Sequence, residues 1–111
     1  MPNRNKQRGY ELEAETVKHW QSLGVEAKRV FASGAHKAHL GDEHAGDLMI
    51  AGFCVEAKRK KSGFKFLYDA LAQDDGISDM LVLKQDRHAR LYVLREETLE
   101  ALFRQAGVIR G

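Results

Sequence analysis

The feature that most constrains this chain is a predicted β-hairpin near its middle. Two short apolar runs flank Ala51-Gly52, a dipeptide typical of a tight turn. Asp47 begins the first run, and the second run ends in Glu56-Ala57-Lys58. Side chains two residues apart on a strand point to the same face, so Glu56 and Lys58 lie side by side. The hairpin therefore places two acids on neighbouring strands, with a lysine beside the second.

The hydrophobic periodicity of the rest of the chain predicts an α/β protein. The expected elements are helix 10–23, strand 25–31, hairpin strands 47–51 and 53–58, helix 64–74, strands 79–84 and 90–94, and helix 96–106. This order, α-β-β-β-α-β-β-α, favours a mixed central sheet flanked by helices. We expect residues 1–9 to be a flexible basic arm and residues 10–111 to form a single domain. Cys54, within an apolar run, is expected to be a small core residue.

The charge distribution is more informative than the net charge of +2. Basic residues cluster at positions 4–8, 28–29 and 58–61, while acidic residues gather elsewhere. One basic face is compatible with phosphate binding, although each cluster alone is equally compatible with solvated surface. No run is long and apolar enough to span a membrane, and the N-terminus does not resemble a secretion signal. We therefore expect a cytoplasmic protein without a membrane partner.

Two further charged residues fall on apolar faces of predicted elements. Glu13 shares a helix side with Val17 and Trp20, and Arg29 shares a strand face with Val25 and Ala27. A carboxylate facing the core is costly unless it is paired or coordinates a cation. Glu13 is thus either an ion-pair partner or a metal ligand. Arg29 is either the partner of Glu13 or a phosphate contact.

The residues of the hairpin suit hydrolysis of a phosphodiester by a bound divalent cation. Mg²⁺ or Mn²⁺ prefers oxygen ligands, activates water and neutralises phosphate charge. Asp47, Glu56 and the backbone carbonyl of Ala57 are candidate ligands, and Glu13 is a candidate third acid. Lys58 is placed to orient water or to stabilise the charge of the transition state. A surface salt bridge across the hairpin is the simpler alternative.

The segment between residues 32 and 46 is a long predicted loop that is rich in histidine. It contains His36, His39 and His44, but no Cys-x-x-Cys motif accompanies them, which argues against structural zinc. Ser33 and Lys37 of this loop are candidate DNA contacts, as are three basic residues after the hairpin, Arg59, Lys60 and Lys61. A plain solvated loop is the alternative.

These residues together resemble the PD-(D/E)xK nuclease superfamily, and within it the small Holliday junction resolvases of archaeal and phage type. Asp47 and Glu56-Ala57-Lys58 are similar to the motif, with Gly46 in the place of its proline. The eleven-residue spacing of Glu13 and Gly24, the strand arginine Arg29, Ser33-Gly34 and the sequence 63–68 also resemble such resolvases.

The resemblance implies a restriction-endonuclease-like α-β-β-β-α-β core and a Mg²⁺-dependent endonuclease acting in DNA recombination and repair. It implies that Glu13, Asp47, Glu56 and Lys58 are catalytic and that the substrate is branched DNA. Symmetric cleavage of two strands further implies a homodimer. No small-molecule cofactor is expected. A repair, nicking or restriction-type nuclease and a non-catalytic nucleic-acid-binding module are the alternatives.

Overall fold

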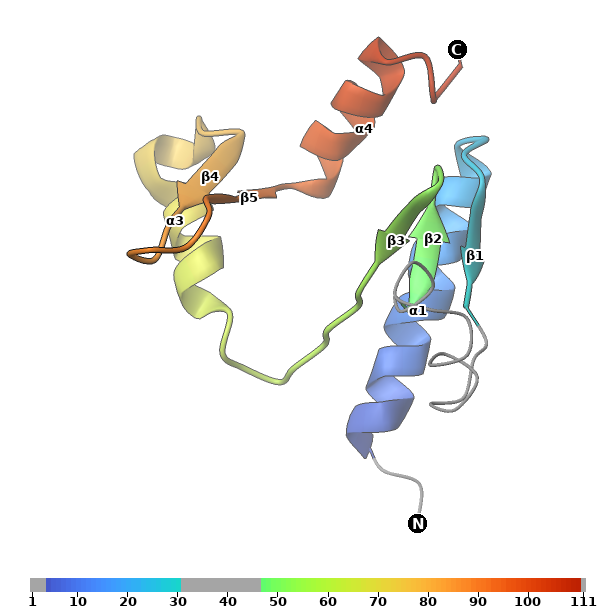
Figure 1. Cartoon of the computed structure of the whole chain (residues 1–111), viewed down its shortest axis with the longest axis horizontal. Helices are drawn as coiled ribbons and strands as arrows, with labels where there is room; N and C mark the ends of the chain where they lie inside the picture. The colour runs from blue at the N-terminus through green and yellow to red at the C-terminus, as the bar shows by residue number, and fades with distance from the viewer. Residues whose placement is uncertain (1–3, 31–46, 111) are drawn as a thin grey trace. The chain divides into compact units, whose positions relative to one another are not determined.

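A computed structural model describes residues 4–30 and 47–110 of the chain. Within these ranges the protein is α/β, with three helices and two small antiparallel sheets, in the element order that the sequence predicted (Figure 1). The chain divides into two compact units, and each is described by itself. The first comprises the described residues up to Lys60 together with residues 108–110, and the second comprises residues 61–107.

Helix α1, Arg4–Ser22, forms one layer of the first unit. Val17 and Trp20 on its inner face are buried, as their spacing predicted. The helix ends at Ser22, and Gly24, two residues later, adopts a left-handed conformation with φ of 79° that favours glycine. Its start lies six residues before the predicted one, so residues 4–9 are helical where a flexible arm was expected.

A three-stranded antiparallel sheet forms the other layer, and α1 packs against it (Figure 1). Its strands, in spatial order, are β1 (Ala27–Arg29), β2 (Leu48–Ile50) and β3 (Phe53–Val55). Leu48 is completely buried, and Ile50, Val25 and Ala27 are also buried. These side chains pack with Val17 and Trp20 in the core of the unit, which fixes the position of the hairpin.

A two-residue turn joins β2 to β3, as the sequence predicted. Ile50 pairs with Phe53, which leaves only Ala51 and Gly52 between the strands. Both turn residues have positive φ, 52° and 86°. Positive φ at both positions is the signature of a type I′ turn, whose twist matches that of the flanking strands. The turn sets the register in which Leu48 faces Val55.

The second unit consists of α3 (Lys65–Gly76), β4 (Met80–Leu83), β5 (Leu91–Leu94) and α4 (Glu96–Gln105). The two strands form an antiparallel hairpin around a turn at positions 85–88. Arg95 ties this unit together, because its guanidinium donates hydrogen bonds to the backbone carbonyls of Ser78 and Leu71. The side chain of Leu71 is buried, whereas no residue of α4 is buried.

Three expectations differ from the structure. The strands form two separate antiparallel sheets in the described part of the chain, not one mixed sheet. The hairpin of β4 and β5 forms between neighbours in sequence, whereas a mixed sheet needs parallel pairing across a crossover. Cys54 is exposed, because it lies on the β3 face opposite Val55. The helical spacing of the apolar residues at 64, 67, 68 and 71 predicts that Tyr68 faces the core from α3, yet Tyr68 is 72% exposed.

No helix within the described ranges is both long and apolar enough to cross a membrane. The loop 32–46, with Ser33, Lys37 and the three histidines, lies outside the described residues.

Candidate active site

Asp47 lies immediately before β2, at the end of the sheet away from the turn. Its backbone N–H donates to the carbonyl of Val55 at 2.9 Å, and its own carbonyl accepts from the N–H of Val30 at 2.9 Å. The residue is therefore held by the strands on both sides of it. These bonds extend the two strand ladders by one step and fix the direction of the Asp47 side chain.

The carboxylate of Asp47 reaches the Glu-x-Lys segment. Its Oδ2 accepts a hydrogen bond from the backbone N–H of Ala57 at 2.9 Å, between Glu56 and Lys58 in sequence. Hydrogen bonds to a charged acceptor are among the stronger ones in proteins. The sequence predicted that Asp47 and Glu56 lie on neighbouring strands, and this hydrogen bond places the Asp47 carboxylate against the backbone next to Glu56. The hydrogen bond to the Ala57 N–H was not predicted, because strand alternation predicts the directions of side chains and not the partners of backbone N–H groups.

Glu56 and Lys58 lie side by side beyond the end of β3. Their charged groups are 3.7 Å apart, and their side chains are 55% and 69% exposed. Such an exposed pair stabilises a fold by less than about 1 kcal/mol. Both side chains can thus reorient at little cost, which suits groups that would turn toward a cation or a phosphate.

Glu13 forms an ion pair with Arg29, one of the two alternatives that the sequence left open. Arg29 Nε lies 3.3 Å from Glu13 Oε1, and the side chains are only 24% and 13% exposed. The guanidinium also lies against the ring of Tyr10, 5.1 Å from its centroid. The apolar faces of α1 and β1 therefore meet at a salt bridge, which offsets the cost of enclosing both charges.

A second ion pair joins α1 to the segment after β3. Arg59 Nη1 lies 3.0 Å from Glu11 Oε2. No sequence pattern indicated this contact, since the two residues are 48 positions apart. It restrains the backbone next to Lys58. Arg59, Lys60 and Lys61 were predicted to contact DNA, and all three are exposed.

The predicted site residues come together in pairs. Asp47 meets Ala57, Glu56 meets Lys58, and Glu13 meets Arg29. Among the described residues, the carboxylate oxygens of Glu13, Asp47 and Glu56 do not all lie within 4.8 Å of one another. The donor set still fits Mg²⁺, because it consists of carboxylate oxygens and the backbone carbonyl of Ala57. Glu56 could approach Asp47 by side-chain rotation, whereas Glu13 would have to exchange its partner.

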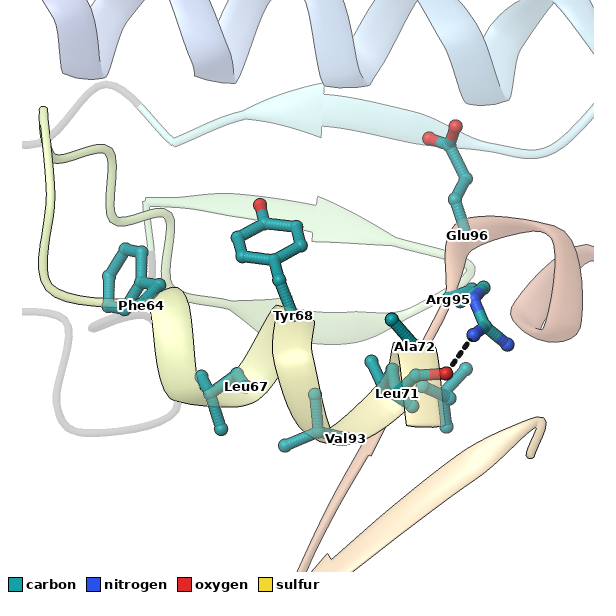
Figure 2. A pocket seen from close by; sticks show the side chains of 9 residues that line it. Phe64, Leu67, Tyr68, Leu71, Ala72, Val93, Arg95 and Glu96 are labelled. Atoms are coloured by element: carbon teal, nitrogen blue, oxygen red, sulfur yellow. Dashed lines mark hydrogen bonds between the residues drawn. The ribbon is translucent and has the colours of Figure 1, made fainter. Parts of the chain in front are cut away.

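The second unit contains a groove of about 800 Å³ (Figure 2). Its lining is mainly apolar and comes from α3, from the residue before it, and from the junction of β5 with α4: Phe64, Leu67, Tyr68, Leu71, Ala72, Val93, Leu94, Arg95 and Glu96. Arg95 lies in it with one nitrogen bonded to the Leu71 carbonyl. Among its lining residues, Glu96 is the only acid.

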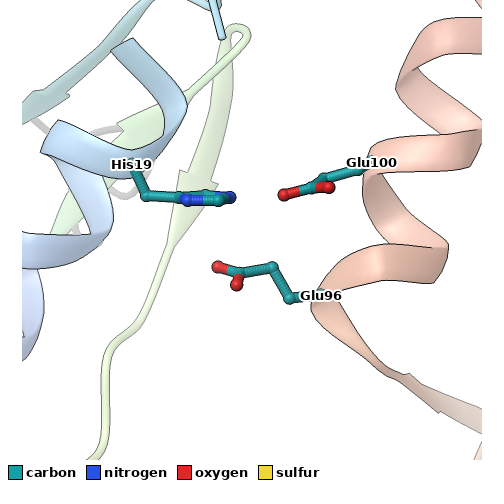
Figure 3. A group of neighbouring side chains, drawn as sticks. All are labelled: His19, Glu96 and Glu100. Carbon is teal, nitrogen blue, oxygen red and sulfur yellow. The ribbon is translucent and has the colours of Figure 1, made fainter. Parts of the chain in front are cut away.

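Glu96 and Glu100 are one helical turn apart on α4 (Figure 3). Glu96 is in the first turn, where a negative charge stabilises the helix dipole. The presence of an acid at position 96 is therefore explained by helix stability, without a ligand. His19, drawn with them, belongs to α1 of the first unit, where its ring meets that of Trp20 edge to face.

Comparison of the chain with models of protein families, with curated proteins and with solved structures found no match. The resemblance to PD-(D/E)xK nucleases therefore stays a prediction from the motif residues.

Proposed function

We propose that this chain is a metal-dependent DNA endonuclease of the PD-(D/E)xK type that acts on branched DNA as a Holliday junction resolvase. The observation that carries the proposal is the hydrogen bond from the Ala57 N–H to Asp47 Oδ2. It brings the aspartate of the motif to the middle of the Glu-x-Lys segment, although Asp47 and Glu56 are nine positions apart in the sequence. The hairpin register alone places Asp47 beside Glu56, and the hydrogen bond adds that the Asp47 carboxylate turns toward the Glu-x-Lys segment.

The residues have distinct roles in the proposed reaction. Asp47 and Glu56, with the backbone carbonyl of Ala57, would hold Mg²⁺ or Mn²⁺, and Glu13 is the third acid. The cation, when bound, supplies Lewis acidity toward the phosphate and lowers the pKa of bound water. Lys58 donates hydrogen bonds to the attacking water or to the phosphate oxygens as negative charge develops on them.

Exposed basic residues support a polyanionic substrate. Positions 58–61 are four consecutive basic residues, and all are exposed. Contacts between such residues and phosphates release counterions, so the affinity for DNA should fall steeply with salt. Ser33 and Lys37, outside the described residues, remain candidate contacts. Two symmetric cuts require two active sites, and we therefore propose a twofold homodimer as the active form.

The experiment compares wild type with Glu56→Gln on labelled linear, flap and four-way DNA, with and without Mg²⁺. Glutamine keeps the size of the exposed side chain and removes only its charge, so the fold is unaffected. We expect Mg²⁺-dependent cleavage of the four-way substrate by wild type and at least about a hundredfold loss in the variant. Equal cleavage by both proteins would refute the catalytic role of Glu56.

The same panel separates the alternative nucleases. If linear and four-way DNA are cut equally at matched salt, the chain is a repair, nicking or restriction-type nuclease and not a resolvase. The readout is the position of the cuts, mapped on each labelled strand.

A second candidate function is a nucleic-acid-binding module without activity. One observation favours it: Glu13 is bound to Arg29, and the three acids do not gather within 4.8 Å. This function predicts DNA binding with an unchanged affinity in Glu56→Gln and no cleavage by wild type with either Mg²⁺ or Mn²⁺.

A further inference from the structure

Arg29 is held between two side chains of a single helix. Its Nε lies 3.3 Å from Glu13 Oε1, and its guanidinium carbon lies 5.1 Å from the centre of the Tyr10 ring. Tyr10 and Glu13 are three residues apart on α1 and so project from the same side of the helix. The helix thus offers the guanidinium one carboxylate and one aromatic face, and both attract a cation.

This arrangement adjoins the backbone that holds Asp47. Arg29 pairs with Leu48 in the register of β1 and β2, and the next residue of β1's chain, Val30, donates its N–H to the Asp47 carbonyl. Arg29 and Asp47 therefore lie on neighbouring strands, one rung apart, at the same end of the sheet. Any cation held by Asp47 would lie at the end of the sheet where the Glu13–Arg29 pair lies.

The ion pair of Glu13 with Arg29 is largely shielded from water, so breaking it changes the electrostatic energy of the site appreciably. The side chains of Glu13 and Arg29 are mostly buried, so water screens their attraction less than it screens the exposed pair Glu56–Lys58. If Glu13 turns its Oε1 toward a metal ion, it gives up the contact of that oxygen with Arg29 Nε. The guanidinium and the cation therefore compete for Glu13.

We propose that Arg29 is a positioning residue that holds Glu13 until a divalent cation binds at Asp47, and that it then exchanges Glu13 for a DNA phosphate. The inference rests on the proposed function and adds a coupling to it. A phosphate that binds Arg29 frees Glu13 and so raises the affinity of the site for the cation. Because linkage is reciprocal, the bound cation raises the affinity for the phosphate by the same factor. Cation binding is then weak without DNA, so the site stays inactive until the substrate is present.

The test measures Mn²⁺ binding to the full chain without DNA, by isothermal titration calorimetry and electron paramagnetic resonance. A double-mutant cycle compares four proteins: wild type, Arg29→Met, Glu13→Gln and the double variant. We expect Arg29→Met to tighten Mn²⁺ binding by about fivefold or more, the lower end of typical couplings. In the Glu13→Gln background the same substitution should change little, because no carboxylate is left to compete for.

Two outcomes overturn the exchange. An equal effect of Arg29→Met in both backgrounds would show that Arg29 acts only as a nearby positive charge. Weaker Mn²⁺ binding in Arg29→Met would show that Arg29 holds Glu13 in the geometry that binds the cation. Circular dichroism of each variant, with thermal unfolding, separates both outcomes from loss of the fold.

Tyr10→Leu provides a second route if Arg29→Met does not fold. It removes the aromatic face and keeps both charges, and the ring is 49% exposed, so the fold should persist. We expect a smaller tightening of Mn²⁺ binding that again depends on Glu13, and no tightening would count against the exchange.

Asp47→Asn separates this inference from the proposed function. If Asp47→Asn binds Mn²⁺ as wild type does, there is no cation site at Asp47, and both proposals fail. If Mn²⁺ binding depends on Asp47 but the cycle shows no coupling, only the exchange fails.

Discussion

Substitutions of Asp47 separate its structural role from its chemical role. Asp47→Asn keeps an oxygen that accepts the Ala57 N–H and removes the charge, whereas Asp47→Ala removes both. A hydrogen bond to a charged group stabilises a protein by about 1.5–3 kcal/mol and a neutral one by about 0.5–1.5 kcal/mol. We therefore expect the free energy of unfolding to fall by about 1 kcal/mol in Asp47→Asn and by about 2 kcal/mol in Asp47→Ala.

Trp20 makes this measurement specific to the first unit. It is the single tryptophan of the chain and is only 2% exposed, in the core between α1 and the sheet. Urea unfolding followed by its fluorescence reports on the unit that contains Asp47. In parallel, both variants should lose Mg²⁺-dependent cleavage, because each lacks the carboxylate that would bind the cation.

The outcomes that refute this reasoning are distinct. If Asp47→Ala is as stable as wild type, the hydrogen bond to Ala57 does not hold the Glu-x-Lys segment. If Asp47→Asn cleaves DNA as wild type does, the carboxylate charge is not needed and Asp47 is not a metal ligand. Loss of cleavage in Asp47→Ala alone would mean that the residue serves only the fold.

Three further predictions concern the hairpin and the segment after it. Leu48→Ala should lower the free energy of unfolding by about 2–5 kcal/mol in the Trp20 fluorescence assay, because the side chain is completely buried; a loss under about 1 kcal/mol would contradict the assigned core. Ala51→Asn should raise it by about 0.5–1 kcal/mol in the same assay, because asparagine tolerates the positive φ at this turn position better than alanine, and a decrease would argue against the type I′ turn. Arg59→Gln should reduce by about one the slope of log affinity for DNA against log salt, measured by fluorescence anisotropy, and an unchanged slope would remove Arg59 from the phosphate contacts.

The element order, the hairpin turn and the buried faces of α1 and β1 could be predicted from short stretches of sequence. Hydrophobic periodicity gave the element order, and the turn signal at Ala51-Gly52 gave the hairpin and hence the meeting of Asp47 with the Glu-x-Lys segment. The buried faces of α1 and β1 followed from the spacing of Val17, Trp20 and Val25. In these cases one segment, or two segments joined by a short turn, contain all of the determining residues.

Longer-range features were beyond such patterns. The ion pair of Glu11 with Arg59 joins residues 48 positions apart, and each charged residue, taken alone, predicts only an exposed position on the surface. The separate pairing of β4 with β5 depends on the competition between a local hairpin and a distant parallel partner, which alternation of side chains does not decide. Cys54 was assigned to the core because its neighbours are apolar, yet β3 is an edge strand on which Phe53 and Cys54 are exposed and Val55 is half-buried.

The site residues differ in how much of the fold depends on them, and this decides which substitution tests chemistry. Asp47 holds β1 and β3 through its backbone and Ala57 through its carboxylate, so its removal perturbs structure and any chemistry together. Glu13 is mostly enclosed and anchors Arg29. Glu56 and Lys58 are exposed, and the contact between them contributes little to stability. A loss of cleavage in Glu56→Gln, at unchanged unfolding by Trp20 fluorescence, is therefore the result that would tie the motif to hydrolysis and not to folding.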